Sequence, residues 1–158
     1  MIVSKIEINN FGPFYGAHTL DVKPEDGKPL IMIRALNDVA KSTILKIFNF
    51  CLYGLTPTKH QAVINRNAAL EKDGTTSILF SYEHNGDQWE LKRSIEYKKV
   101  KKWMDPPDIV STNVSLIQNG KPMIDPAGKI GTETELKEKI AEIIPEEISQ
   151  FFFFDGEN

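Results

Sequence analysis

Apolar and polar residues follow two different periods along the chain, and the change of period predicts where strands and helices lie. Residues 2–8 alternate imperfectly and are rich in β-branched side chains, and residues 18–22 behave similarly, so both predict strands. Residues 30–33 form a short apolar run, which is typical of a strand buried on both faces. From 41 to 53 the apolar residues recur at helical spacing. A buried strand, a tight loop and a helix are therefore predicted in succession.

The next part of the chain contains one strong turn signal. Residues 55–75 are polar and contain proline and glycine, so we expect a surface excursion without packed elements. Residues 76–83 and 88–97 have strand character and flank Asn85-Gly86, two residues that tolerate positive φ. These features predict a β-hairpin.

One more strand and one more helix are predicted before the chain ends. Residues 113–118 have strand character and precede a second Asn-Gly turn at Asn119. Thr132 and Glu135 have the spacing of a helix capping box, and the helix should stop before Pro145. Its apolar face comprises Leu136, Ile140, Ile143 and Ile144.

Alternating strands and helices without internal repeats predict one domain, residues 1–158, of α/β or α+β architecture. The final residues are four phenylalanines, 151–154, followed by Asp-Gly-Glu-Asn. Because an exposed aromatic run favours aggregation, we expect this sequence to be part of a longer chain. The aromatic run itself is interpreted as a packed strand rather than as a ligand box, with Asp155 as its functional residue.

Composition excludes some classes of function. The 158 residues are 41% hydrophobic, enough for one core, and 19 basic against 22 acidic residues give a net charge of −3. Any contact with DNA must therefore be local. The single cysteine, Cys51, lies in an apolar stretch, and the N-terminal residues resemble neither a signal peptide nor a membrane span. These features predict a cytoplasmic protein without a membrane partner.

The candidate chemistry lies between the buried strand and the first helix. A phosphate-binding loop has the pattern GxxxxGK[ST], in which backbone N–H groups surround phosphates, the lysine reaches the β- and γ-phosphates, and the hydroxyl holds magnesium. The chain has Lys41 and Ser42 at the corresponding positions. The candidate nucleotide-binding residues are Ala35, Leu36, Asn37, Asp38, Val39, Ala40, Lys41, Ser42 and Thr43.

This loop departs from the pattern at both glycines, which are Ala35 and Ala40. A Cβ atom obstructs the backbone angles and the close phosphate approach that glycine allows, and the charge of Asp38 opposes incoming phosphates. The loop is therefore expected to bind nucleotide weakly. The alternative is that Ala-Lys-Ser-Thr only begins an ordinary helix.

Four stretches, in order, resemble the N-terminal lobe of the SMC- and SbcC-type ABC ATPase heads: residues 6–14, 30–45, 89–95 and 151–157. The resemblance implies an α/β P-loop NTPase fold of ABC type, with an antiparallel β-hairpin subdomain. Within that superfamily, the strings NFGPFYG and FFFFDGE are most similar to the DndD ATPases of DNA phosphorothioation. Repair or SMC-type ATPases outside that system remain an alternative.

The resemblance also implies roles for single residues. Lys41 would contact the β- and γ-phosphates of ATP, Ser42 would bind Mg²⁺, Thr43 would contact the α-phosphate, and Asn37 would lie beside the γ-phosphate. Asp155 stands at the Q-loop position, where a carboxylate could supply an oxygen to Mg²⁺ in catalysis.

It implies partners as well: the C-terminal lobe of the same protein, a second head in an ATP-dependent dimer, DNA, and other DNA-modification proteins. In this family the remaining catalytic motifs lie in the C-terminal lobe. The full-length protein would therefore be an ATPase, whereas these 158 residues alone should not hydrolyse ATP. A head that no longer uses nucleotide and serves as a structural or partner-binding unit is the other hypothesis, which Ala35, Asp38 and Ala40 favour.

One basic cluster stands out near the predicted hairpin, interleaved with Tyr97 and Trp103. Lysines there could pair with DNA phosphates, as the resemblance suggests, or could form a solvated loop. The cluster consists of Lys92, Arg93, Lys98, Lys99, Lys101 and Lys102.

Overall fold

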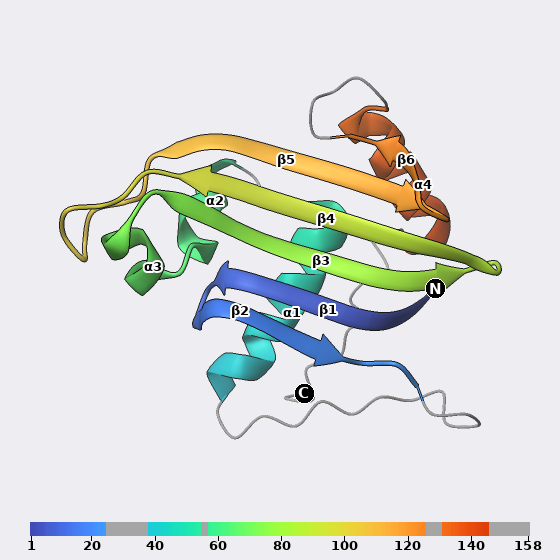
Figure 1. The fold of residues 1–158 in the computed structure, drawn as a ribbon, viewed down its shortest axis with the longest axis horizontal. Helices are drawn as coiled ribbons and strands as arrows, with labels where there is room; N and C mark the ends of the chain where they lie inside the picture. The colour runs from blue at the N-terminus through green and yellow to red at the C-terminus, as the bar shows by residue number, and fades with distance from the viewer. Residues whose placement is uncertain (25–37, 55–56, 126–130, 146–158) are drawn as a thin grey trace.

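A six-stranded antiparallel sheet forms the centre of the computed structural model, which describes residues 1–24, 38–54, 57–125 and 131–145 (Figure 1). The strand order across the sheet is β2-β1-β3-β4-β5-β6. The strands are Ile2–Phe11 (β1), Phe14–Asp21 (β2), Gly74–His84 (β3), Asp87–Tyr97 (β4), Ile109–Gln118 (β5) and Lys121–Ile124 (β6). The helices are Asp38–Tyr53 (α1), Pro57–Val63 (α2), Arg66–Glu71 (α3) and Glu133–Ile143 (α4).

The predicted hairpin is confirmed as β3 and β4, joined at Asn85 and Gly86, which have φ values of 54° and 84°. It is not a separate subdomain, however, because β3 also pairs with β1 and β4 also pairs with β5. The hairpin therefore forms the middle of the sheet. The second Asn-Gly turn, at Asn119, is confirmed too and leads into β6, a short strand that the sequence pattern did not reveal.

Helix α1 lies across one face of the sheet and closes the core. Its apolar residues Ile47, Cys51 and Leu52 are buried, as the helical spacing predicted, and Phe50 is buried as well. The ring of Phe48 meets that of Phe80 on β3 edge-on, with centroids 4.9 Å apart. Burial raises the pKa of the Cys51 thiol to about 12, so the thiol is inert, as expected for a packed residue. The predicted strand 30–33 lies outside the described residues.

The prediction of a surface excursion for residues 55–75 is wrong. This segment contains α2 and α3, which pack near one end of the sheet (Figure 1). Ala68 and Ala69 of α3 are buried, together with Ile64 between the two helices. Both helices are so short that their apolar residues never complete the repeat by which a helix is recognised in a sequence. Their stability comes from packing rather than from helix propensity.

The predicted capping box begins α4. The Glu135 amide donates to the Thr132 hydroxyl at 3.2 Å, and the Thr132 amide donates to the Glu135 carboxylate at 2.6 Å. Leu136 and Ile140 are buried, and the helix ends before Pro145, as predicted. The Tyr53 hydroxyl at the end of α1 donates to the carbonyl of Ile144, so both helices are joined at this point.

Candidate nucleotide-binding site

The start of α1 carries the described part of the candidate phosphate-binding loop. Ala35, Leu36, Asn37 and Asp155 lie outside the described residues. The other predicted loop residues, Asp38, Val39, Ala40, Lys41, Ser42 and Thr43, are the first six residues of α1. The helix therefore begins three residues before the predicted start, and the backbone N–H groups of its first turn have no helical carbonyl partner.

Ser42 and Thr43 have opposite environments in the first turns of α1. Thr43 is 5% exposed, whereas Ser42 is exposed to solvent. A hydroxyl at the surface can act as a Mg²⁺ ligand, because magnesium takes hard oxygen donors and retains water molecules. The role of Ser42 as a Mg²⁺ ligand stays a prediction, with its hydroxyl on an exposed residue.

A tight turn between β1 and β2 lies under the start of α1. Asn10 and Gly12 both have left-handed backbone angles, with φ values of 51° and 53°. A Cβ added to Gly12 would lie 3.5 Å from the Thr43 methyl group, so the turn and the helix are close neighbours. Glycine at position 12 therefore provides the backbone angle, and its neighbour Phe11 packs on Phe50 of α1 with centroids 5.4 Å apart.

The connection between α2 and α3 holds this turn in place. The Gly12 amide donates to the Val63 carbonyl at 2.7 Å, and the Asn65 amide donates to the Asn10 carbonyl at 2.8 Å. The Asn65 side chain also donates to the Gly12 carbonyl at 2.8 Å, while its oxygen caps α3. Asn65 is only 5% exposed and uses both ends of its amide. Sequence reasoning missed this residue, although a lone asparagine after Val63-Ile64 was a possible helix-cap signal.

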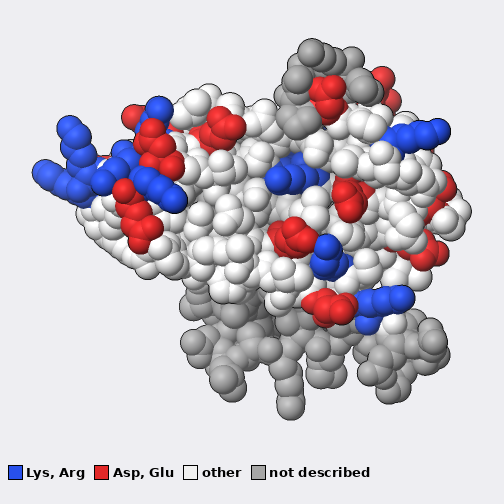
Figure 2. Space-filling model, viewed as in Figure 1, with Lys and Arg blue, Asp and Glu red and all other residues white. Residues whose placement is uncertain are grey.

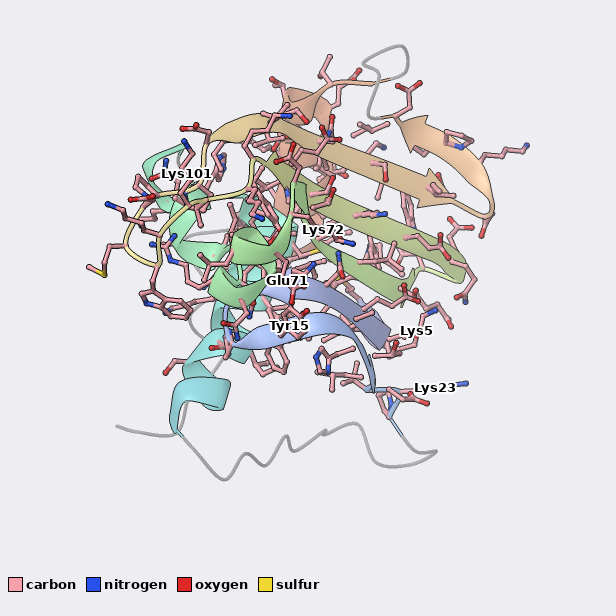
Figure 3. All side chains as sticks on the ribbon, turned by 60° about the vertical axis from the view of Figure 1, so that its left-hand side comes forward. Lys5, Tyr15, Lys23, Glu71, Lys72 and Lys101 are labelled. Atoms are coloured by element: carbon pink, nitrogen blue, oxygen red, sulfur yellow. The ribbon has the colours of Figure 1, made fainter. Side chains whose placement is uncertain are left out.

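The outer end of the same turn is attached to α3. The Tyr15 hydroxyl donates to the Glu71 carboxylate at 2.6 Å, and the two side chains point toward each other (Figure 3). This bond raises the pKa of Tyr15. Together with the Asn65 contacts, it makes the β1–β2 turn, α3 and the start of α1 one packed unit.

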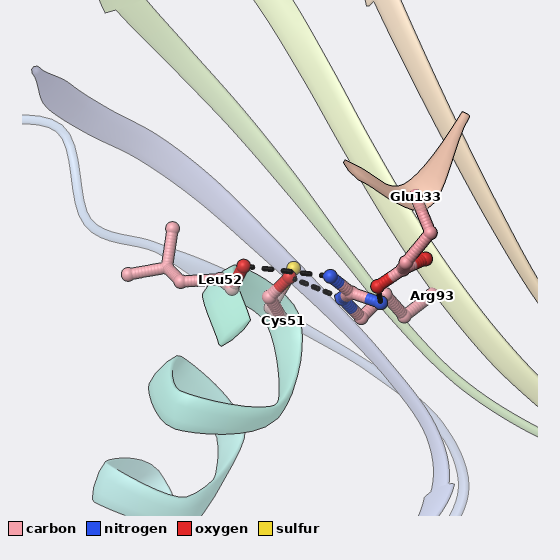
Figure 4. Close-up of polar contacts among 4 residues, drawn as sticks. All are labelled: Cys51, Leu52, Arg93 and Glu133. Carbon is pink, nitrogen blue, oxygen red and sulfur yellow. Dashed lines mark hydrogen bonds and ion pairs between the residues drawn. The ribbon is translucent and has the colours of Figure 1, made fainter. Parts of the chain in front are cut away.

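Arg93 fixes the other end of α1. Its Nε donates to the Cys51 carbonyl at 2.8 Å, one Nη donates to the Leu52 carbonyl at 3.5 Å, and the other Nη pairs with Glu133 at 2.7 Å (Figure 4). The last carbonyls of a helix lack intrahelical donors and carry partial negative charge, so a guanidinium is a favourable partner. Arg93 thereby joins α1 to the first residue of α4.

This position corrects the prediction that Arg93 belongs to a DNA-binding cluster. Its side chain is 8% exposed on the inner face of the sheet, and its donors are engaged by α1 and α4. Lys92 is exposed on the opposite face, because neighbouring residues of a strand point to opposite sides. The alternation of Leu91, Arg93 and Ile95 was the signal that could have placed Arg93 inside.

The four remaining lysines of the cluster lie in the connection between β4 and β5, residues 98–108, which we call the tip loop. Lys98 pairs with Asp73 at 2.9 Å. Lys99, Lys101 and Lys102 are exposed, and Figure 2 shows basic side chains gathered at this end of the molecule, with acidic ones beside them. The structure thus divides the predicted cluster into three separate environments.

Three further features of the described residues bear on function. They contain no group of three or more His, Cys, Asp or Glu side chains that could hold a metal ion, and none of their helices is long and apolar enough to cross a membrane. A half-open cavity of about 530 Å³ lies beside Arg93, between the ends of α1 and α4 and the inner face of β4 and β5. It is therefore at the far end of α1 from Ser42.

Comparison with known proteins supports the interpretation of the fold. The model of a family described as an AAA domain matches residues 5–158. The SbcC component of the SbcCD nuclease of Vibrio cholerae serotype O1 is 26% identical over 124 residues. The aligned region is 76% of this chain but 12% of SbcC, so the chain spans a small part of the relative's length.

Proposed function

Since this chain belongs to the AAA domain family, we propose that it is the ATP-binding part of an ATPase that acts on DNA. The observation that carries the proposal is the start of α1, where Ser42 is exposed and Thr43 is buried against the β1–β2 turn. Family membership supports the use of nucleotide, and the similarity to a component of a nuclease supports an action on DNA.

In this proposal the start of α1 and the residues before it bind Mg-ATP. Lys41 contacts the β- and γ-phosphates, Ser42 binds Mg²⁺, and Thr43 lies by the α-phosphate through its backbone, since its side chain is buried. Asn37 would lie beside the γ-phosphate. Asp155 would supply a carboxylate oxygen to a bound magnesium ion, and that ion would stabilise developing charge on the phosphates.

The whole protein would complete the site. We propose that a C-terminal lobe of the same protein supplies the remaining catalytic groups and that two heads dimerise around ATP. Within this class, the strings NFGPFYG and FFFFDGE favour an ATPase of DNA phosphorothioation over a repair or SMC-type ATPase. The genes beside the coding sequence test this finer assignment, because a phosphorothioation ATPase should lie near a sulfur-transfer gene.

A second candidate function is a structural head that no longer binds nucleotide. It is favoured by Ala35, Asp38 and Ala40, because two Cβ atoms and one negative charge stand where a phosphate-binding loop normally has glycine. In that case α1 would be an ordinary packed helix, and the protein would serve only to hold its partners.

Calorimetric titration of Mg-ATP into the full chain separates the two functions. We expect weak binding that Lys41→Ala abolishes and that Lys46→Ala leaves unchanged, because Lys46 is an exposed lysine of the same helix outside the loop. Returning Ala35, Asp38 and Ala40 to glycine should tighten binding by about tenfold or more, since removal of one opposing charge alone accounts for such a change. No binding by either the natural or the glycine-restored chain would leave the structural head as the function.

A further inference from the structure

The tip loop exposes large apolar side chains to solvent, where they do not contribute to the hydrophobic core. The Asp105 amide donates to the Lys102 carbonyl at 3.1 Å, which closes a β-turn with Trp103 and Met104 at its centre. Trp103 is 54% exposed and Met104 is 82% exposed. The central positions of such turns usually hold glycine, proline, asparagine, aspartate or serine. A tryptophan and a methionine there point to a partner outside the chain.

The loop is anchored, so its tip is presented in one conformation. The Lys98 amide donates to the Asp108 carbonyl at 2.9 Å, and the Val100 amide donates to the Ala69 carbonyl of α3 at 2.9 Å. The Val100 side chain is 5% exposed and belongs to the core. Figure 1 shows this loop extending beyond the end of the sheet. Because its base is fixed, ordering the tip costs little on binding.

Side chains and backbone close the turn further. The Lys102 amide donates to the Asp105 carboxylate at 3.0 Å, and Arg66 of α3 donates to the Asp105 carbonyl at 2.8 Å. The Asp105 carboxylate thus accepts a hydrogen bond within the loop and stabilises the turn. The two apolar side chains remain on its outer side, beside the lysines.

Charge complementarity identifies the class of partner. Residues 98–108 contain four lysines and two aspartates, a local net charge of +2 in a chain of net charge −3. Among the described residues, the Lys98 ammonium pairs with Asp73, whereas the ammonium groups of Lys99, Lys101 and Lys102 form no ion pair with a carboxylate. The backbone amides of Lys99 and Lys102 do donate to the carboxylates of Asp73 and Asp105. Figure 3 shows Lys101 at this end, away from the sheet. The partner is therefore negatively charged and offers an apolar or aromatic surface.

We propose that the tip loop binds single-stranded nucleic acid, with the Trp103 indole stacked on an unpaired base and Lys99, Lys101 and Lys102 on the neighbouring phosphates. Aromatic side chains beside lysines are the usual means of binding single strands, because every base has a π face. In a duplex those faces are covered by the next base pair. One indole and one thioether also form too small an apolar patch for stable membrane attachment. The inference rests on the proposed action on DNA and adds the strand state of the substrate.

Fluorescence anisotropy with a labelled oligothymidylate and a blunt duplex of equal length tests the proposal on the full chain. We expect tighter binding to the single strand, and Trp103→Ala should weaken it about 5- to 150-fold. Trp103→Leu should weaken it similarly, because leucine is apolar but has no π face, whereas Trp103→Phe should retain most of the affinity. Since Trp103 is exposed, these variants should fold normally, and their thermal unfolding confirms it.

The charge contribution has a matched control. Lys101→Ala should reduce the slope of log affinity against log salt by about 0.7. Lys121→Ala removes another exposed lysine, at the start of β6, and should leave that slope unchanged. Equal slopes for both variants would overturn the proposal.

Other outcomes distinguish this inference from the proposed function. Stacking would be refuted if Trp103→Leu left binding to the single strand intact. It would also be refuted if the loop bound the duplex equally well. Either result would still be compatible with the proposed action on DNA. Loop-dependent binding to phosphatidylserine vesicles without binding to either oligonucleotide would replace the nucleic acid by a membrane surface. Nucleotide binding is measured separately by the Mg-ATP titration, so a failure there leaves the tip-loop result interpretable.

Discussion

Arg93→Met offers the sharpest test of how the far end of α1 is held. Methionine preserves an unbranched apolar stem but removes the guanidinium that donates to the Cys51 and Leu52 carbonyls. Both carbonyls end a helix, and Gly54, with φ of 79°, already turns the chain away from it. The substitution should therefore destabilise the fold.

The structure sets the size of the expected effect. One short hydrogen bond from a buried cation is worth about 1.5–3 kcal/mol, and the charge at the helix C-terminus adds about 0.3–1 kcal/mol. The longer bond to Leu52 adds little. Glu133 is left without its partner, but its side chain is 46% exposed and can be hydrated, so the ion pair itself contributes at most about 1 kcal/mol. Altogether we expect Arg93→Met to lower the free energy of unfolding by about 2–4 kcal/mol.

Urea unfolding followed by circular dichroism measures this loss. The midpoint should fall while the dependence of the free energy on urea stays the same. Glu133→Gln should lower the free energy of unfolding by less than about 1 kcal/mol, since it removes only the charge of the exposed partner. Lys92→Met is the matched control, because it removes the neighbouring cation from the outer face of the same strand. The reasoning is refuted if Arg93→Met costs no more than Glu133→Gln.

Three further predictions concern other contacts. The Lys99 amide and Lys98 hold the pKa of the Asp73 carboxyl below its usual 3.8. The hydrogen bond from the Lys99 amide should therefore persist at neutral pH and be lost as the pH falls through that lowered pKa. An NMR titration of the Lys99 amide measures this, and a midpoint above 3.8 would contradict it. Thr132→Ala should destabilise α4 by about 1 kcal/mol in thermal unfolding, with no change expected if the cap is unimportant. Gly131→Ala should lower the melting temperature clearly more than Gly120→Ala. Both glycines have positive φ, but of the two only Gly131 would place a Cβ against a carbonyl oxygen, at 2.5 Å. Equal melting temperatures of the two variants would disprove the clash.

The sequence by itself determined the elements whose signals are local. The Asn85-Gly86 turn needs only positive φ at two adjacent residues, and the Thr132 capping box needs only two side chains three residues apart. The helix after the Ala-Lys-Ser-Thr string followed from its apolar spacing. The pattern also placed Lys41 and Ser42 at the helix start, whereas in the structure the helix begins at Asp38 and they are its fourth and fifth residues.

The tertiary structure decided what depends on residues far apart in the chain. Asn65 and Gly12 are joined by a hydrogen bond across 53 positions, and Arg93 reaches Cys51 across 42. Sequence alone placed Arg93 with the basic residues beside it, because charge is visible in a sequence whereas burial depends on partners brought by folding. For the same reason α2 and α3 were invisible: short helices are stable only when other elements cover them.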